Sequence, residues 1–436
     1  MPKNQRVCLH DMSLYTDGSL TPDGKSLGVV SLINYAWRAA LLDHICVVPR
    51  REGGEAYHRY LRGFGLGASR VIQVDGDNLY DGCRADPSVM QELRNLFESG
   101  AECEHFATSA KSEAFDQELG VCAAQLRSPA RHVMAQLDDK ANLRELARAI
   151  DALNVFPEFR YATEPAEIRV ACAALLDTYE IVFVKRPDLE SGTGCMPVSR
   201  ETFGGDAFTA FLREFATGAR ELIVEEGVFG TKEDPMIDCS IQFHLDAAGQ
   251  ANQLFASLQY MEGPDKNVHA GNLIAASDTG CLPLSWDFVD RYQVARGMFT
   301  DVQPFIDWAL THHGAATGRL GFDLRVNRTR RVILEGNYRY TAASYPEAVR
   351  WQLVRSGRLS SPCVIMRNIH LPESCLWQDL PRRFGMLGFN GNSRGVLVCN
   401  PFCCESPADP KFVAICVGNS RDEAEWYLAE VKRLFA

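Results

Sequence analysis

The chain of 436 residues lacks the segments that would place it at a membrane or on nucleic acid. It has no run of about 18 apolar residues, so no transmembrane helix is expected. Its first ten residues contain no apolar core of signal-peptide length. There is no long basic run and the formal net charge is −11, so we expect no nucleic-acid partner and no membrane partner. These absences favour a cytoplasmic protein.

Cysteine is abundant, at 15 residues, but the patterns that would assign it a function are missing. No two cysteines form a C-x-x-C pair, and none lies in a cysteine/histidine cluster with zinc spacing. The tight group Cys399, Cys403 and Cys404 has no histidine near it. Buried free thiols in a reducing compartment are therefore expected. The chain also lacks a Ser-His or Cys-His signature of a nucleophilic enzyme.

The composition is that of a globular protein, with 46% hydrophobic and 23% charged residues. The length allows two to four domains, and the patterns divide the chain into the blocks 1–130, 131–220, 221–345 and 346–436. The first block alternates apolar runs with helical stretches, which favours an α/β domain. The last block ends in a strand and an amphipathic helix, which favours an α+β arrangement.

The two middle blocks contain several distinct elements. Apolar side chains at helical spacing predict a helix over 139–153, and a second helix is predicted over 286–312. Strands are predicted over 181–187, 221–226, 237–245 and 252–259.

The most informative segment is a predicted hairpin over 321–339. Asp323 and Glu335 are equidistant from Thr329, so without a bulge they would face each other across the strand pair. Side-chain alternation places Glu335, Asn337 and Arg339 on one face. The other face would carry Leu334, Gly336, Tyr338 and Tyr340.

Two acids, an amide and a guanidinium on one face serve no purpose in a core. Hard oxygen ligands of this kind suit Mg²⁺ held between carboxylates and nucleotide phosphates. The alternative is an exposed hairpin whose outer face carries plain salt bridges.

Two strand ends precede the hairpin and point to a nucleotide. Lys185 ends an apolar strand, and the small-residue loop 190–194 follows it. A lysine there can contact phosphates while the loop amides close over them. Glu225 and Glu226 end another strand, where backbone groups and a carboxylate can pair with an adenine. Each feature alone is also typical of a solvated strand end.

In this order the motifs resemble the ATP-grasp superfamily. The matching segments are Asp139-Lys140, Val182 to Lys185 with Ser191 to Gly194, Val224 to Glu226, and Asp323 with Glu335 to Arg339. The resemblance covers roughly residues 130 to 345 and implies that ATP lies between two α+β subdomains, 131–220 and 221–345. It also implies that a carboxylate is activated as an acyl phosphate, which a nucleophile, usually an amine, then attacks.

The blocks on either side of this region, 1–130 and 346–436, point to a narrower group within the superfamily. A long α/β region before the core and a strand-plus-helix block after it look like the pheganomycin-type peptide ligases. That layout implies a pre-ATP-grasp domain over 1–130 and a C-terminal domain over 346–436.

The resemblance implies a role for each matched residue. Lys140 and Lys185 would contact the ATP phosphates, with Ser191, Gly192 and Gly194 from the loop. Glu225 would accept from the adenine amine, and the backbone at Glu226 and Val228 would pair with the ring. Asp323, Glu335 and Asn337 would hold Mg²⁺, and Arg339 would stabilise the acyl phosphate as a catalytic residue. The acid that contacts ribose stays open between Glu233 and Asp238.

We therefore expect an ATP-dependent carboxylate–amine ligase with two Mg²⁺ ions, for which Mn²⁺ can substitute. Its partners would be small amino-acid or peptide substrates, with natural-product biosynthesis as one setting and a homodimer as one assembly. One alternative is a ligase that loads an amino acid onto a carrier-protein thiol. Another is a nucleotide-binding regulatory module that does not turn over. The sequence does not identify the acid or the amine.

Overall fold

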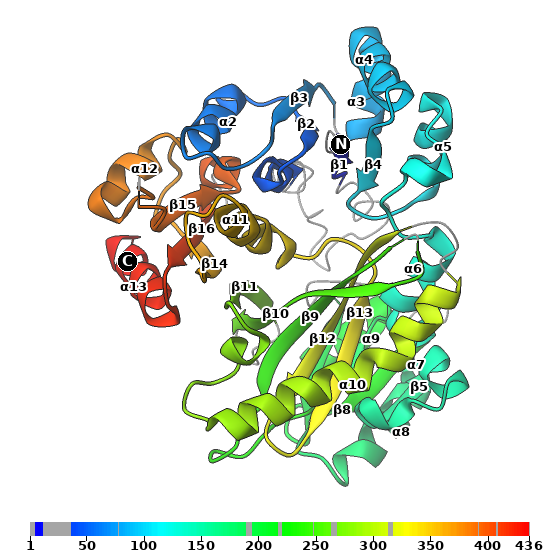
Figure 1. Ribbon diagram of the computed structural model, residues 1–436. Helices are drawn as coiled ribbons and strands as arrows, with labels where there is room; N and C mark the ends of the chain where they lie inside the picture. Colours follow the sequence, from blue (N-terminus) through cyan, green and yellow to red (C-terminus); the bar gives the residue numbers. More distant parts are fainter. Residues whose placement is uncertain are drawn as a thin grey trace.

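The computed structural model has three β-sheets with helices packed around them (Figure 1). The residues that it describes are 5–11, 36–76, 78–188, 194–216, 220–246, 248–262, 268–312, 317–390, 392–406 and 409–435. Within these residues no helix has the length and apolar character needed to span a bilayer.

The N-terminal sheet is parallel, with the strand order β3-β2-β1-β4. Its strands are β1 (Arg6–Leu9), β2 (Ile45–Pro49), β3 (Arg70–Val74) and β4 (Glu102–His105). The helices of this region are η2 (Trp37–Leu41), α2 (Gly54–Gly63), α3 (Leu79–Ala85), α4 (Pro87–Glu98), α5 (Ala110–Leu119) and η3 (Ala123–Gln125). All five residues of β2 are buried, as expected for a parallel sheet covered on both faces.

The second sheet is antiparallel, with the order β5-β8-β6-β7. It contains β5 (Phe159–Ala162), β6 (Ile181–Lys185), β7 (Cys195–Ser199) and β8 (Leu222–Glu226). The helices of this region are α6 (Arg131–Asp138), α7 (Lys140–Ala149), η4 (Leu153–Val155), α8 (Pro165–Leu176) and α9 (Asp206–Phe215).

The helix predicted over 139–153 is shorter in the structure. Helix α7 begins after the N-cap Asp139 and ends at Ala149. Its extension is blocked because Asp151 adopts a left-handed conformation with φ of 56°. The next residues form η4 instead.

The third sheet has eight strands, all antiparallel, in the order β13-β12-β9-β10-β11-β14-β16-β15. They are β9 (Ile237–Leu245), β10 (Ala251–Glu262), β11 (Val268–Ile274), β12 (Gly318–Val326), β13 (Arg331–Asn337), β14 (Cys363–His370), β15 (Gly395–Cys399) and β16 (Lys411–Gly418). Helix α10 (Phe288–His312) lies across β9, β12 and β13 (Figure 1). The remaining helices are η5 (Asp278–Cys281), α11 (Ser344–Arg355), α12 (Asp379–Phe384), η6 (Gly385–Leu387), η7 (Pro401–Glu405) and α13 (Arg421–Phe435).

The predicted fold class, α/β followed by α+β regions, is confirmed by these three sheets. The division of the chain into four domains remains a prediction. Two of the sheets contain strands from two neighbouring predicted blocks. Strand β8 was placed at the start of the block 221–345, but it is hydrogen-bonded between β5 and β6. Strands β14 to β16 of the last block extend the sheet that carries the acidic hairpin.

The N-terminal and C-terminal regions also share one hydrophobic core. Trp37 and Tyr57 of the first region pack against Phe402 of the last, with ring centroids 5.0 and 6.5 Å apart. The Tyr57 hydroxyl donates to the carbonyl of Val398 at 2.9 Å. The two ends of the chain are therefore parts of one packed unit, which includes strands β14 to β16 of the eight-stranded sheet.

Candidate functional site

The acidic hairpin is formed by β12 and β13, and it contains a bulge that the sequence did not predict. The turn spans Asn327 to Arg330, where the Asn327 amide donates to the Arg330 carbonyl at 2.9 Å. Val326 pairs with Arg331, so the turn is centred half a residue before Thr329. A bulge at Leu334 then shifts the register back, and Asp323 pairs with Glu335. The predicted pairing of Asp323 with Glu335 is thus correct, although it was predicted for a hairpin without a bulge and the hairpin has one.

The bulge also changes which side chains share a face. Leu334 was predicted to lie opposite Glu335, but both line the same cavity. Two consecutive residues can do this because a bulge interrupts the alternation of side chains. Gly336 does lie on the far face, where an added Cβ would be 2.7 Å from the Leu137 carbonyl oxygen of α6.

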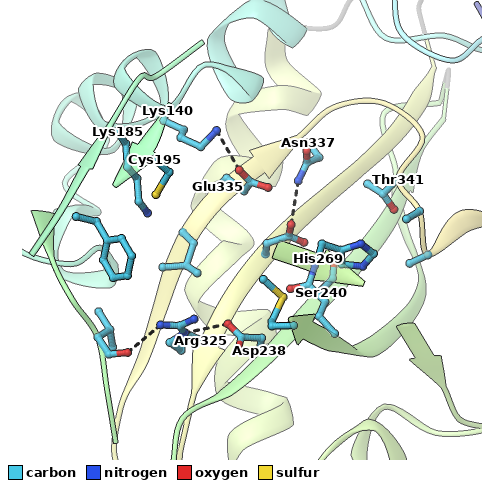
Figure 2. A pocket seen from close by; sticks show the side chains of 18 of the residues that line it. Lys140, Lys185, Cys195, Asp238, Ser240, His269, Arg325, Glu335, Asn337 and Thr341 are labelled. Carbon is cyan, nitrogen blue, oxygen red and sulfur yellow. Dashed lines mark hydrogen bonds and ion pairs between the residues drawn. The ribbon is translucent and has the colours of Figure 1, made fainter. Parts of the chain in front are cut away.

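The structure brings most of the predicted site residues together around one cavity of about 240 Å³ (Figure 2). Those on its lining are Lys140, Lys185, Glu225, Glu226, Val228, Asp323, Glu335, Asn337 and Arg339. They come from the start of α7, the ends of β6 and β8, and the β12–β13 hairpin. Gly194 precedes β7 with a φ of 65° and is not on the lining, while Ser191 and Gly192 lie outside the described residues.

Lys140 is held at the N-terminus of α7. The Asp139 carboxylate caps this helix by accepting from the amides of Ala141 and Asn142 at 2.9 and 3.0 Å. The Lys140 side chain extends to Glu335, with Nζ 3.1 Å from Oε2 (Figure 2). An ammonium group therefore lies directly beside the acid pair.

Lys185 ends β6 and forms an ion pair with Glu225 on the adjacent strand β8. Glu225 also accepts from Arg144, whose side chain is fully buried between the rings of Phe156 and Phe159. Burial opposes the charge of Glu225, but Lys185 and Arg144 outweigh it and lower the pKa of this carboxyl. Two cations thus keep a fully enclosed carboxylate ionised.

Asp323 and Glu335 form a pair in which one group holds the proton. Burial, together with the charge of Glu335, raises the pKa of Asp323 to about 7. For Glu335 burial acts in the same direction, but Lys140 and a hydrogen bond from Asp323 outweigh it, and the pKa falls to about 2. Two adjacent carboxyls that share a proton form a suitable binding site for a divalent cation.

Asn337 and Arg339 continue the polar face beyond the acids. Asn337 Nδ2 donates to Asp323 Oδ2 at 3.4 Å (Figure 2), and Arg339 Nη2 donates to Asn337 Oδ1 at 2.6 Å. Asp138, the last residue of α6, accepts from Arg339 Nε at 3.1 Å. The guanidinium is therefore oriented by partners on two sides.

The segment after β8 is fixed by two arginines of the hairpin. Arg330 Nη2 donates to Glu226 Oε2 at 2.8 Å, and Arg325 Nη1 donates to the Val228 carbonyl at 3.1 Å. Arg325 Nε also contacts Asp238 Oδ1 at 2.9 Å (Figure 2). Asp238 lines the cavity and Glu233 does not, and which of the two contacts ribose stays a prediction.

Sequence comparisons yield nothing for this chain: no family model matches it, and no curated protein matches it. Solved structures do resemble it. Carboxyaminoimidazole ribonucleotide synthase from Aspergillus clavatus in complex with ATP aligns with a TM-score of 0.55 at 9% identity, over 99% of this chain and 98% of that one. Phosphoribosylamine–glycine ligase from Thermotoga maritima aligns with 0.54 at 12% identity, over 98% and 96%. The biotin carboxylase–β,γ-ATP complex from Campylobacter jejuni aligns with 0.53 at 12% identity, over 99% and 91%.

The chain has the ATP-grasp fold. At these identities the likeness establishes the fold and not the reaction. Within this ATP-grasp fold the cavity described above is bordered by residues of the β5–β8 sheet and by residues of the eight-stranded sheet.

Several residues of the ATP-grasp cavity were not found from the sequence. They are Phe183, Arg186, Cys195, Ser240, Gln259, Met261, His269, Asn272, Arg325, Leu334, Thr341, Ala342 and Ala343. One signal was available for part of this set. Asp238, Ser240 and Gln242 alternate along β9, and Ser240 pairs with Asp323, so they share the face of the acids.

His269 is the most distinctive of the missed residues. Its Nε2 lies 2.9 Å from Asn272 Oδ1, an amide oxygen that can only accept, so Nε2 carries the proton and Nδ1 is left as an acceptor. Burial lowers the pKa of His269 to about 4, which makes the ring neutral at physiological pH. Figure 2 places it with Ser240, Asn337 and Thr341, across the cavity from the two lysines.

Proposed function

We propose that this protein is an ATP- and Mg²⁺-dependent carboxylate–amine ligase that works through an acyl phosphate and joins amino-acid or peptide substrates. One observation carries the proposal: the acid pair Asp323–Glu335 lines the same cavity as Lys140 and Lys185. The fold supports it, because one of the similar structures is a complex with ATP.

The nucleotide would lie along the end of β8. The backbone at Glu226 and Val228 would pair with adenine, against the apolar side chains of Phe183 and Leu334, which line the same cavity. The phosphates would lie toward Lys140 and Lys185. Before ATP binds, both lysines form ion pairs with acids, Lys140 with Glu335 and Lys185 with Glu225. The ATP phosphates would compete with these acids for the lysines. The pairs would also keep each ammonium group from being left without an anion in the absence of nucleotide.

The acid pair and Asn337 form an oxygen-rich donor set that fits Mg²⁺. They would hold two ions, and Mn²⁺ would substitute. When bound, the metal offsets the repulsion between an attacking carboxylate and the γ-phosphate. Asp323 would give up its proton to form the site, and Lys140 would remain beside Glu335 as a further positive charge.

The reaction has two balanced steps. A carboxylate oxygen of the substrate attacks the γ-phosphorus, and the bond to ADP breaks. An amine then attacks the acyl carbon, phosphate leaves, and the nitrogen loses a proton. Arg339, oriented by Asp138 and Asn337, would stabilise the negative charge of the acyl phosphate and of the oxyanion that follows.

The layout of the chain supports the narrower assignment to peptide ligases similar to the pheganomycin type. An α/β region with its own parallel sheet precedes the ATP-grasp core, and strands β14 to β16 follow it.

The test is a screen of amino acids and short peptides with ATP, Mg²⁺ and hydroxylamine. The proposal predicts a hydroxamate with one class of acid, ADP in equal amount and no AMP. Glu335→Gln removes a ligand charge at almost constant volume, so hydroxamate formation should fall by about 10²-fold. Asp301→Asn is the control, because Asp301 holds Arg331 of the same hairpin at 2.6 Å but is not on the cavity lining.

Two outcomes would contradict the proposal. Acid-dependent formation of AMP would indicate that the acid is adenylated, because a route through an acyl phosphate releases ADP and not AMP. ATP binding without acid-dependent ADP for any acid in the screen would favour a nucleotide-binding module.

A further inference from the structure

A second cluster of functional groups is not part of the ATP-grasp cavity lining and lies in the N-terminal region. Cys103 and His105 are two residues apart on β4, so they lie on one face of the strand. Asp116 reaches them from α5. Their side chains are almost fully buried, with residue exposures of 0%, 1% and 6%.

The three donor atoms converge on one point. Cys103 Sγ lies 3.6 Å from His105 Nε2 and 3.5 Å from Asp116 Oδ1. His105 Nε2 lies 2.9 Å from Asp116 Oδ1. The other ring nitrogen of His105, Nδ1, contacts the Tyr80 hydroxyl at 3.0 Å.

The charge of this cluster needs a cation. A buried carboxylate is costly unless a positive group accompanies it. Among the described residues, His105 lies within ion-pair distance of the Asp116 carboxylate, and no lysine or arginine does. A bound metal ion would supply that positive charge.

A neighbouring cluster of similar composition shows the contrast. Cys8, His44 and Glu104 also lie close together. There Arg6 Nη1 lies 3.3 Å from Glu104 Oε2, so a guanidinium already balances the carboxylate. A metal ion would add charge to that cluster, whereas it would neutralise the cluster around Asp116.

We propose that Cys103, His105 and Asp116 bind Zn²⁺. Tetrahedral zinc with bonds of about 2.3 Å to sulfur and about 2.0–2.1 Å to nitrogen and oxygen requires edges of roughly 3.6 Å for S–N, 3.5 Å for S–O and 3.3 Å for N–O. The first two match the observed separations. The imidazole and the carboxylate must move apart by a few tenths of an ångström.

The chemistry of binding is balanced. The Cys103 thiol loses its proton, and the neutral imidazole coordinates through Nε2 with its proton on Nδ1, where it donates to Tyr80. A thiolate, a carboxylate and Zn²⁺ sum to zero charge. The described residues supply three donors to the group, the number of protein ligands in zinc sites that leave the fourth position open.

The test uses the full-length protein and the metal alone. Zinc content is measured by plasma mass spectrometry after expression in zinc-supplemented medium. The metal is then removed with a chelator, and Co²⁺ is titrated in. The expected result is one zinc per chain and a thiolate-to-cobalt charge-transfer band in the near ultraviolet. The oxygen ligands around Asp323 and Glu335 would not give this band.

Cys103→Ala and His105→Gln should each lose the zinc and the band. Cys83→Ala, a buried cysteine of the same core, should keep both. The proposal is overturned if folded wild-type protein takes up neither metal. It is equally overturned if both ligand variants retain the metal. Metal uptake by the wild-type protein can overturn the proposal by itself, so the experiment remains decisive even if a variant misfolds.

Discussion

At the scale of single residues, the cations of the cavity are already paired with anions. Lys140 contacts Glu335, and Lys185 contacts Glu225. The pairs balance charge within a low-dielectric site. A nucleotide must therefore exchange partners with these groups, and the effect of a substitution depends on the partner that is left behind.

Lys185→Ala should weaken ATP much more than AMP, because the proposal places Lys185 at the phosphates and not at adenine. A charge-assisted hydrogen bond contributes about 1.5–3 kcal/mol, so a loss on the order of 10- to 100-fold is expected for ATP. Calorimetric titration with both nucleotides measures this. An equal loss for ATP and AMP would place Lys185 outside the phosphate site.

Glu225→Gln should destabilise the protein at neutral pH, because it leaves the buried Arg144 without its counter-charge. Removing one partner of a buried pair costs about 3 kcal/mol or more. The folded-state pKa of Glu225 lies below its usual value of 4.5, so the stabilisation is complete above that pH. It is lost as the pH falls through the folded value.

Denaturant unfolding of both proteins from neutral to acid pH tests this. The stability difference should shrink below pH 4.5, the usual value of the glutamate pKa, because protonated Glu225 resembles glutamine. Glu118→Gln is the control, since it removes an exposed partner of Arg84 and should change little. A stability difference independent of pH would show that Glu225 is not held ionised.

At the scale of elements, the hairpin shows how far the sequence could be interpreted. The acids, the amide and the arginine could be identified because such polar side chains on one face of a strand are not expected in a hydrophobic core and therefore indicate a binding site. Leu334 was misplaced because a bulge depends on what the strand packs against, and α6 packs there. His269 and Asn272 could not be found, since their place beside the acids depends on the long-range pairing of β9 with β12. The cluster of Cys103, His105 and Asp116 could not be found either, because it depends on how helix α5, which carries Asp116, packs against β4.

The close contact between α6 and β13 gives a prediction for these elements. Gly336→Ala should push them apart, because the new Cβ would lie 2.7 Å from the Leu137 carbonyl oxygen. Overpacking of this kind typically costs about 1–3 kcal/mol. The shift would also disturb Asp138, which follows Leu137 and orients Arg339.

Chemical denaturation measures the stability loss. Gly63→Ala is the matched control, because nothing lies within 4 Å of its added Cβ. Stability should there be unchanged or slightly raised. If Gly336→Ala were as stable as the Gly63 variant, the described contact between α6 and β13 would be wrong.

At the scale of the whole molecule, the shared core of the two chain ends predicts that they unfold together. Phe402→Ala removes a ring that packs on Trp37 and Tyr57, at a cost of about 3–5 kcal/mol. Hydrogen exchange should then increase in β2 as well as in β16. Phe208→Ala, in the separate core under the β5–β8 sheet, should increase exchange there and leave β2 protected. If hydrogen exchange in β2 were unchanged in the Phe402→Ala variant, the two chain ends would not unfold as one unit.

The strand order of the eight-stranded sheet has a consequence for synthesis on the ribosome. The hairpin that carries the acids is complete once Asn337 has been made, but the outer edge of β11 is paired only by β14, and β14 by β16. While the residues between His370, the end of β14, and Gly418, the end of β16, are being translated, the nascent chain presents a strand edge whose native partner is not yet complete. Unpaired edges recruit other chains. Productive folding of this chain therefore depends on shielding that edge until β16 emerges from the exit tunnel.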